Sequence, residues 1–288
     1  MPIMQSLADF LRSAPFELIL SSGFFGFYAH AGVVAALEEA GLVPAAAGGS
    51  SAGAMIAGLW GAGLSATQIR EELFALNRAD FWDPDPLLGL GYYARKLGGR
   101  GLAAVAELAS EGPGTGVGFL RGDAFDRLLR AALARVGVRT FAECRIPVRL
   151  SVFDLEARRT KVLAEGELAP AIRASCSVPG MFQPTQIGAT RYLDGGITDR
   201  PGIAAATPGA RVLFHHLAPK SPWRRVVRSQ NNPPAWPEMY LLHEPGLPQL
   251  SPFHLTGGPQ AYRLAREMAL RTLSQPPVRH HHPEHPPE

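Results

Sequence analysis

The sequence has few cysteines, little net charge and no detectable repeat, and each absence excludes a class of protein. Its 288 residues include only two cysteines, Cys144 and Cys176, which lie far apart and lack the C-x-x-C spacing of zinc and redox sites. The net charge is only +3, whereas nucleic-acid binding requires clustered Lys and Arg. We therefore expect no disulfide framework, no metal site and no nucleic-acid partner.

Signals for membrane targeting are also missing. The first residues have no basic opening before their apolar run, so they lack the order of a secretory signal. The segment Val43–Gly61 is small and apolar, but it is rich in Gly and Ala and short for a membrane span, which needs about 20 strongly apolar residues. We expect a cytoplasmic protein that contacts a membrane at most peripherally.

The chain does contain enough apolar residues for a large core. Apolar residues make up 46% of it and charged residues 18%. For this length we expect one large domain, residues 1–275. The last segment, 276–288, is rich in Pro and His and is predicted to be a disordered tail.

Short apolar runs typical of strands alternate with helical spacing of apolar residues. The clearest example is Phe16–Leu20, an apolar run that ends in a glycine turn and leads into a helical pattern. Alternation of this kind predicts an α/β fold, in which helices cover both faces of a mostly parallel central sheet in three layers. We predict strands over 16–20, 43–48, 146–155, 160–165, 191–196 and 211–217, and helices over 27–40, 52–63, 66–77, 123–137, 168–176 and 259–273.

One segment matches the pattern of a nucleophilic serine. Gly49-Ser50-Ser51-Ala52-Gly53 is a G-x-S-x-G motif, which places its central serine on a sharp turn between a strand and a helix. Gly49 and Gly53 are required there because a Cβ would clash in the turn. A helix of small residues packed closely on a sheet would have the same sequence pattern, so the motif alone leaves both interpretations open.

The turn after the first predicted strand is a candidate oxyanion hole. It spans residues 21–26, contains Gly26 and opens into a helix, so it exposes consecutive backbone N–H groups that can bind an anion. Our candidate donors are the amides of Ser22, Gly23 and Phe24.

The same turn resembles a degraded dinucleotide-binding fingerprint. Ser21 stands in the place of the first glycine, and Glu38 and Glu39 lie too early to be the acid that binds the ribose. We therefore expect no nicotinamide, and no other cofactor is indicated.

A second candidate for catalysis is Asp194. It ends a predicted strand and is followed by Gly195 and Gly196. Asp-Gly is also among the commonest turn pairs, so by itself this feature favours an ordinary turn.

A Ser–His–Asp triad is one way to use these residues. The chain order of an α/β-hydrolase would be satisfied by Ser51, Asp194 and a later histidine. That fold places several strands before its nucleophile, whereas only one strand–helix unit and a weak strand precede Ser51. His30, alone on the first predicted helix, is interpreted as a packing residue. The histidines that would complete a triad are His215, His216, His243 and His254.

Four blocks, in this order, resemble the patatin-like phospholipases: LSSGFFGFYAHAGVVAAL, GGSSAGAM, AIRASCSVPGMFQP and YLDGGITDRP. The resemblance covers residues 16–217. It implies a Ser–Asp dyad without histidine, in which Ser51 is the nucleophile and Asp194 the base. It also implies that the turn 21–26 supplies the oxyanion hole and that the block ASCSVPGMFQP lines the site.

The first block departs from the family pattern. The family usually has three consecutive glycines and then a basic residue, whereas here Ser21 and Ser22 replace two glycines and Phe25 stands at the basic position. Backbone donors survive such changes if the backbone conformation remains accessible. The missing basic side chain removes a phosphate contact, which weighs against phospholipid preference more than against ester hydrolysis.

These patterns together predict a serine acyl hydrolase of the phospholipase, lysophospholipase or esterase type, acting on lipid or similar carboxylic esters through an acyl-enzyme. The alternatives are a non-catalytic lipid-binding or regulatory relative, a Ser–His–Asp esterase and an acyltransferase. The apolar loop Asp83–Gly99 is a candidate lid. The basic segment Ala218–Arg228 is a candidate membrane contact, although a solvated loop is the simpler interpretation.

Overall fold

A computed structural model of the chain describes residues 5–84, 118–217, 234–248, 250–251 and 254–280. Residues 85–99 of the candidate lid and the whole candidate membrane contact lie outside these ranges.

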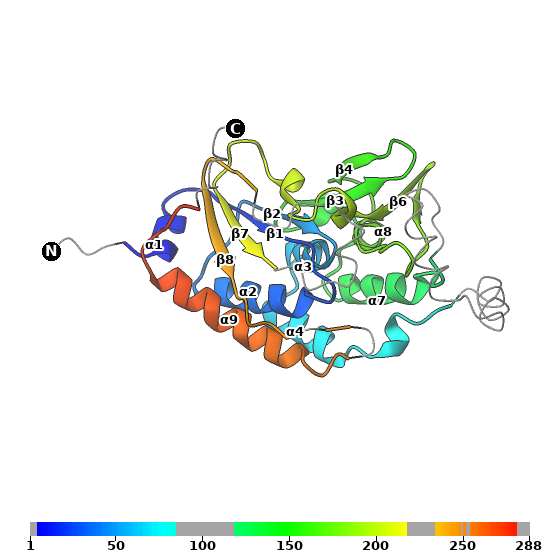
Figure 1. Ribbon diagram of the computed structural model, residues 1–288, viewed down its shortest axis with the longest axis horizontal. Helices are drawn as coiled ribbons and strands as arrows, with labels where there is room; N and C mark the ends of the chain where they lie inside the picture. The colour runs from blue at the N-terminus through cyan, green and yellow to red at the C-terminus, as the bar shows by residue number, and fades with distance from the viewer. Residues whose placement is uncertain (1–4, 85–117, 218–233, 249, 252–253, 281–288) are drawn as a thin grey trace, which may run out of the picture.

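The centre of the structure is an eight-stranded sheet with the order β5-β6-β3-β2-β1-β7-β8, and β4 pairs with β3 off this path (Figure 1). Neighbouring strands from β3 through β2, β1 and β7 to β8 are parallel. The strands at the other edge are antiparallel to their neighbours. The strands are β1 Glu17–Leu20, β2 Ala46–Ser50, β3 Val148–Asp154, β4 Arg159–Leu163, β5 Thr185–Ile187, β6 Thr190–Asp194, β7 Val212–His216 and β8 Met239–His243.

The α-helices of the described ranges contribute to one core on a single face of the sheet. Leu18 and Leu20 of β1 point into this core, because alternate residues of a strand face the same side. The helix α2 is buried along almost its whole length, which fits its position between the sheet and α9. The helices are α1 Leu7–Arg12, α2 Phe27–Glu39, α3 Ala52–Gly61, α4 Ala66–Ala75, α7 Asp123–Ala134, α8 Leu168–Ser175 and α9 Gly258–Ser274.

Short 3-10 helices cover the opposite face. Ile19 of β1 packs there against Ala205 and Phe214, and η4 (Ile203–Ala205) lies over these residues. The helix η3 (Gly195–Ile197) covers the neighbouring part of this face. The α/β class and the mostly parallel sheet are thus confirmed, with α-helices on one face and 3-10 helices on the other. The connection from β6 to β7 has to cross β3, β2 and β1, so few of its residues remain to form a long helix. Two further 3-10 helices are η1 Arg78–Asp80 and η2 Phe141–Glu143.

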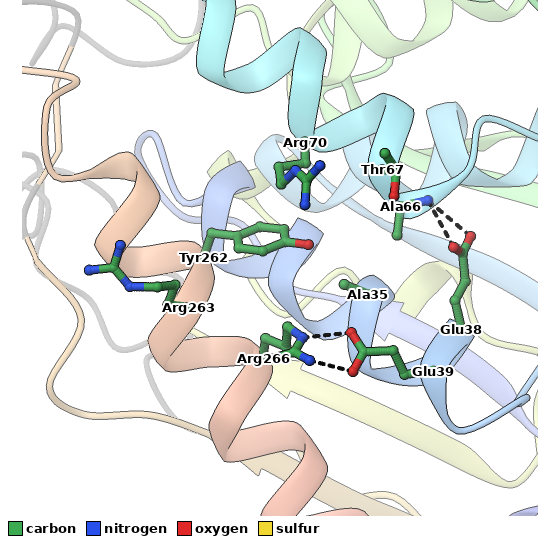
Figure 2. Close-up of a pocket in the computed structure, with 9 residues that line it drawn as sticks. All are labelled: Ala35, Glu38, Glu39, Ala66, Thr67, Arg70, Tyr262, Arg263 and Arg266. Atoms are coloured by element: carbon green, nitrogen blue, oxygen red, sulfur yellow. Dashed lines mark hydrogen bonds and ion pairs between the residues drawn. The ribbon is translucent and has the colours of Figure 1, made fainter.

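The junction of α2, α4 and α9 is held by polar contacts (Figure 2). Arg266 of α9 donates two hydrogen bonds to the carboxylate of Glu39 on α2, at 2.6 and 2.5 Å. Glu38 accepts from the backbone N–H of Ala66, the first residue of α4. Ser65 and Gln68 have the S-x-x-Q spacing that predicts a capping box, and the structure confirms this box at the start of α4. A cavity of about 320 Å³ lies at this junction, and no predicted site residue lines it.

The structure continues into the segment expected to be a disordered tail. Arg279 pairs with Tyr240 of β8, and the N–H of His280 donates to the Met239 carbonyl. Residues 281–288 lie outside the described ranges. Among the described residues, no helix combines the length and the apolar character that a membrane crossing requires.

Candidate active site

Ser51 lies on a strained turn between β2 and α3. Its backbone has φ 53° and ψ −120°, a conformation that is unfavourable for a residue other than glycine. The two motif glycines allow the turn to pack against β1: a Cβ on Gly49 would lie 2.3 Å from the Leu20 carbonyl oxygen, and one on Gly53 2.1 Å from the same atom. Close packing therefore explains both glycines. The strained backbone conformation belongs to Ser51, which lies between them.

Asp194 ends β6 and contacts Ser51 directly. The hydroxyl Oγ of Ser51 donates a hydrogen bond of 2.6 Å to Oδ2 of Asp194, although 143 residues separate them in the chain. The backbone N–H of Gly196 donates to the other carboxylate oxygen at 2.7 Å. Ser51 is 8% exposed and Asp194 5%. The structure thus brings the two predicted residues together in a nearly water-free place.

Neighbouring atoms leave no room for a Cβ at the two glycines after Asp194. A Cβ on Gly195 would lie 2.2 Å from the Ser151 carbonyl oxygen. A Cβ on Gly196 would lie 2.5 Å from the hydroxyl of Ser22 and 3.0 Å from Oδ1 of Asp194. The Asp-Gly-Gly segment therefore lies between β3 and the turn 21–26, and an ordinary surface turn does not explain it.

Burial raises the pKa of Asp194 to about 6 from an ordinary value of 3.8. The hydrogen bonds from Ser51 and Gly196 and the charge of Arg200 act in the opposite direction. A carboxylate with this pKa is a better base near neutral pH than a solvated aspartate, because its proton affinity is higher.

This pKa predicts the acid limb of the pH profile. Only ionised Asp194 can accept a proton, so kcat/KM for a carboxylic ester should fall about tenfold per pH unit below a midpoint near 6. The measurement is kcat/KM between about pH 4 and 9, with circular dichroism at each pH to show that the fold persists. A profile that stays flat through this range in the folded protein would contradict the assignment.

The turn 21–26 provides fewer free amides than the sequence predicts. The N–H of Ser22 donates to the Arg200 carbonyl at 2.7 Å, so this predicted donor is already used. The amides of Gly23 and Phe24 have no acceptor in the described part of the chain. Phe25 has φ 54°, which turns the backbone before α2. Gly23 and Phe24 therefore remain as candidate donors, and Ser22 does not.

Leu217, which directly follows β7, leaves no room for a Cβ at the two glycines of this turn. A Cβ on Gly23 would lie 2.4 Å from Cδ1 of Leu217, and one on Gly26 2.2 Å from the same atom. Ser21, which begins the turn, accepts the Leu217 N–H on its hydroxyl at 2.9 Å. The position of the candidate donors thus depends on β7 as well as on β1.

Ser175 is a residue of the site that sequence reasoning missed. Its hydroxyl accepts the backbone N–H of Ser51 at 2.9 Å and donates to the Ser151 carbonyl at 2.7 Å. The thiol of the next residue, Cys176, donates to the Ser51 carbonyl at 3.2 Å. Both residues belong to the block ASCSVPGMFQP, so the resemblance indicated the segment but not the contacts. They hold the strained backbone of Ser51 from the end of α8.

His30 and His215 form a buried pair beneath the turn. Nδ1 of His30 and Nδ1 of His215 are 2.8 Å apart, and Nε2 of His30 lies 2.8 Å from the Ser21 carbonyl oxygen. Because a carbonyl only accepts, Nε2 of His30 carries the hydrogen, and Nδ1 of His215 then donates to Nδ1 of His30. Burial lowers the pKa of both rings, to about 3 for His30. The pair is neutral and supports the turn through Ser21.

The other histidines considered for a triad are engaged elsewhere. Nδ1 of His243 donates to the His216 carbonyl at 3.1 Å, and the two rings contact each other. The backbone of His254 pairs with Ser251. Both oxygens of Asp194 are taken by Ser51 and Gly196, so in the described chain no imidazole lies between the serine and the aspartate. Within the described ranges there is also no group of three or more His, Cys, Asp or Glu residues that could hold a metal ion.

A family model described as patatin-like phospholipase matches residues 18–207 of the chain. The matched range includes Ser51, Asp194 and the whole turn 21–26.

Individual proteins are also similar to this chain. An NTE family protein of Mycobacterium tuberculosis is 30% identical over 182 residues, which are 63% of this chain and 42% of that protein. The lysophospholipase nte1 of Emericella nidulans is 27% identical over 198 residues, or 68% of this chain and 11% of that protein. The chain thus spans less than half the length of these curated relatives. Among solved structures, VipD from Legionella pneumophila aligns over 93% of this chain and 68% of its own, with a TM-score of 0.48 and 14% identity.

Proposed function

The chain belongs to the patatin-like phospholipase family, and from this we propose that it is a serine acyl hydrolase that cleaves carboxylic ester bonds of lipids. The observation that carries the proposal is the buried hydrogen bond of 2.6 Å from the Ser51 hydroxyl to Asp194. A nucleophile in direct contact with a base is the minimal requirement for acyl transfer to serine. The lipid as substrate is supported by the family and by the name of the lysophospholipase relative.

In the proposed acylation step, Asp194 accepts the proton of Ser51 while Oγ attacks the ester carbonyl. The negative charge that develops on the carbonyl oxygen needs donors, for which we propose the amides of Gly23 and Phe24. The N-terminal end of α3, which begins at Ala52, adds a positive dipole beside Oγ. The alcohol then leaves with the proton from Asp194, and an acyl-Ser51 ester remains.

In the proposed deacylation step, water takes the place of the alcohol. Asp194 removes a proton from the water as its oxygen attacks the acyl-Ser51 ester; when the bond from the acyl carbon to Oγ breaks, Asp194 returns the proton to Oγ and the carboxylic acid is released. The strained backbone of Ser51 is held by Ser175 and Cys176 through both steps, so the hydroxyl keeps its position relative to the carboxylate. Peripheral contact with a lipid surface remains part of the proposal.

Three single substitutions test whether a histidine takes part. His216→Ala, His243→Ala and His254→Ala should each keep kcat/KM for a soluble ester within about threefold of the original, because a general base contributes about 100-fold or more and none of these side chains contacts Ser51. Hydrolysis of an ester panel and labelling by a fluorophosphonate probe are the measurements. A loss of about 100-fold in one of them, with native circular dichroism, would support a triad instead. If the original protein neither hydrolyses esters nor takes the label, the non-catalytic lipid-binding alternative applies.

A further inference from the structure

The cavity at the junction of α2, α4 and α9 is separate from the proposed active site (Figure 2). It has a volume of about 320 Å³, and each of the three helices contributes three of the residues that line it. A water molecule takes up about 30 Å³ of the liquid, so the volume corresponds to about ten water molecules. The cavity is therefore large enough for a small organic molecule.

Both carboxylates of the cavity are already engaged by the protein. Arg266 donates two hydrogen bonds to Glu39, at 2.6 and 2.5 Å. Glu38 accepts the backbone N–H of Ala66 on both of its oxygens at 3.0 Å, and the Nε1–H of Trp60 at 2.8 Å. The two glutamates are therefore explained by the contacts that join the helices.

The side chain of Tyr262 brings a hydroxyl without a partner into this cavity. The residue is only 8% exposed, and its hydroxyl makes no hydrogen bond to any described residue. The buried Tyr28, in contrast, donates to the Leu73 carbonyl at 3.0 Å. Figure 2 shows the Tyr262 hydroxyl pointing away from α9 into the space between α2 and α4. Because a buried tyrosine hydroxyl usually has a hydrogen-bond partner, its absence here indicates a ligand.

Contacts on both sides hold Tyr262 in this orientation. Its ring packs edge-on against Phe74 of α4, with the ring centroids 5.6 Å apart. Its main chain lies against α2, because a Cβ on Gly32 would lie 2.2 Å from the Tyr262 carbonyl oxygen. Burial raises the pKa of Tyr262 above its ordinary value of 10.0. The hydroxyl therefore keeps its hydrogen at neutral pH and can donate it to an acceptor in the cavity.

Arg70 supplies a positive charge beside this hydroxyl. Its guanidinium faces the same space as the Tyr262 hydroxyl (Figure 2). The residue is half-buried, and no carboxylate of the described ranges lies within ion-pair distance of it, whereas the half-buried Arg149 lies 2.6 Å from Glu17. Arg263 also lines the cavity, but it is exposed and its guanidinium points away from the other groups in Figure 2. Arg70 is therefore the cation available to a ligand.

We propose that this cavity binds a small organic carboxylate, which pairs with the Arg70 guanidinium and accepts the Tyr262 hydroxyl. The lining contains three arginines and two glutamates, which leaves one positive charge in excess. One carboxylate balances this charge, whereas a phosphomonoester carries about −1.5 to −2. The planar guanidinium can donate two parallel hydrogen bonds to the two oxygens of a carboxylate. Ala35 and the Tyr262 ring provide apolar contact for a short carbon skeleton. Binding here is independent of the proposed hydrolase function.

The test is a ligand-observed NMR titration of the full chain with benzoate, neutral benzamide and phenyl phosphate. The measured quantity is the Kd of each compound. Benzoate and benzamide have the same ring and nearly the same size, so the difference between them reports the charge. The buffer contains no carboxylate or phosphate and has an ionic strength of about 20 mM, because salt screens exposed charges. The variants are Arg70→Gln, Tyr262→Phe and the control Arg127→Gln, which changes an exposed arginine of α7.

The original protein should bind benzoate with a Kd of about 1 to 10 mM, and more tightly than the other two compounds. Arg70→Gln should raise this Kd about 10-fold or more, and Tyr262→Phe about 3- to 10-fold, the usual effects of losing hydrogen bonds to a charged ligand. Arg127→Gln should change it by less than about twofold. Tyr262→Phe should keep the urea midpoint of the original protein, because its hydroxyl has no partner among the described residues, whereas Tyr28→Phe, which removes a buried hydrogen bond, should lower the midpoint.

Several results would overturn the site or its ligand class. Benzoate that binds Arg70→Gln or Tyr262→Phe as tightly as the original protein occupies another place, such as the candidate oxyanion donors. Equal affinity for benzamide would show an uncharged site, and tighter binding of phenyl phosphate would show a phosphate site. If Arg127→Gln weakens binding as much as Arg70→Gln, the attraction is due to net charge alone. No binding of benzoate up to about 50 mM would end the proposal, while the roles of Ser51 and Asp194 are tested separately by ester hydrolysis.

Discussion

Ser51→Ala should lower kcat/KM for carboxylic esters by about 10⁴-fold or more, because removal of a serine nucleophile leaves only binding and oxyanion stabilisation. The fold should be preserved, since the hydroxyl contacts only Asp194 among the described residues by hydrogen bonding, and the backbone contacts to Ser175 and Cys176 do not need it. Labelling by a fluorophosphonate probe should disappear together with hydrolysis.

The matched control for this variant is the preceding residue. Ser50 is fully buried, and its hydroxyl has no hydrogen-bond partner within the described chain. Ser50→Ala should therefore keep activity and labelling within about threefold, since it removes no group of the proposed mechanism. If Ser51→Ala still takes the probe, or if Ser50→Ala loses it while folded, the nucleophile has been assigned to the wrong residue.

Asp194→Asn should have two opposite effects, a large loss of activity and a gain in stability. The amide cannot accept the proton of Ser51, so kcat/KM should fall by about 10⁴-fold, as when a catalytic aspartate is replaced in other serine hydrolases. The amide can still accept from Gly196 and reach Ser51, so the contacts of the side chain are largely kept. What is removed is a buried charge.

The sign of the stability change follows from the direction of the pKa shift. The folded protein raises the pKa of Asp194 from 3.8 to about 6, so it binds the proton more tightly than the unfolded chain does. The stability that protonated Asp194 contributes is fully present below about pH 4 and is lost as the pH rises through about 6. A shift of this size corresponds to about 3 kcal/mol, and Asp194→Asn should recover much of it at pH 8.

Urea unfolding at about pH 8 and pH 5 measures this effect. Asp194→Asn should be more stable than the original protein at the higher pH, and the difference should shrink at the lower pH. Asp9→Asn, which changes an exposed aspartate of α1, should not reproduce this gain in stability at pH 8 and should leave hydrolysis intact. An Asp194→Asn variant that hydrolyses esters at the original rate, or is no more stable at pH 8, would contradict the assignment of a desolvated general base.

The sequence by itself determined the features that depend on neighbouring residues. The alternation of apolar runs and helical patterns predicted the α/β class, because each element must bury one face. The glycines at 49 and 53 indicated a tight strand–helix turn at Ser51, and Ser65 with Gln68 indicated the start of α4. These features are local, since backbone conformation and capping involve groups only a few residues apart.

Only the tertiary structure decided which distant groups meet. The contact between Ser51 and Asp194 depends on β6 pairing with β3 beside β2, and no spacing along the chain fixes that order. The loss of Ser22 as a free donor and the support of Ser51 by Ser175 both arise where segments more than 100 residues apart lie in contact. A hydrogen-bond donor is available only if nothing else in the fold accepts from it, so the candidate amides of this site could be identified only from the tertiary contacts of the described residues.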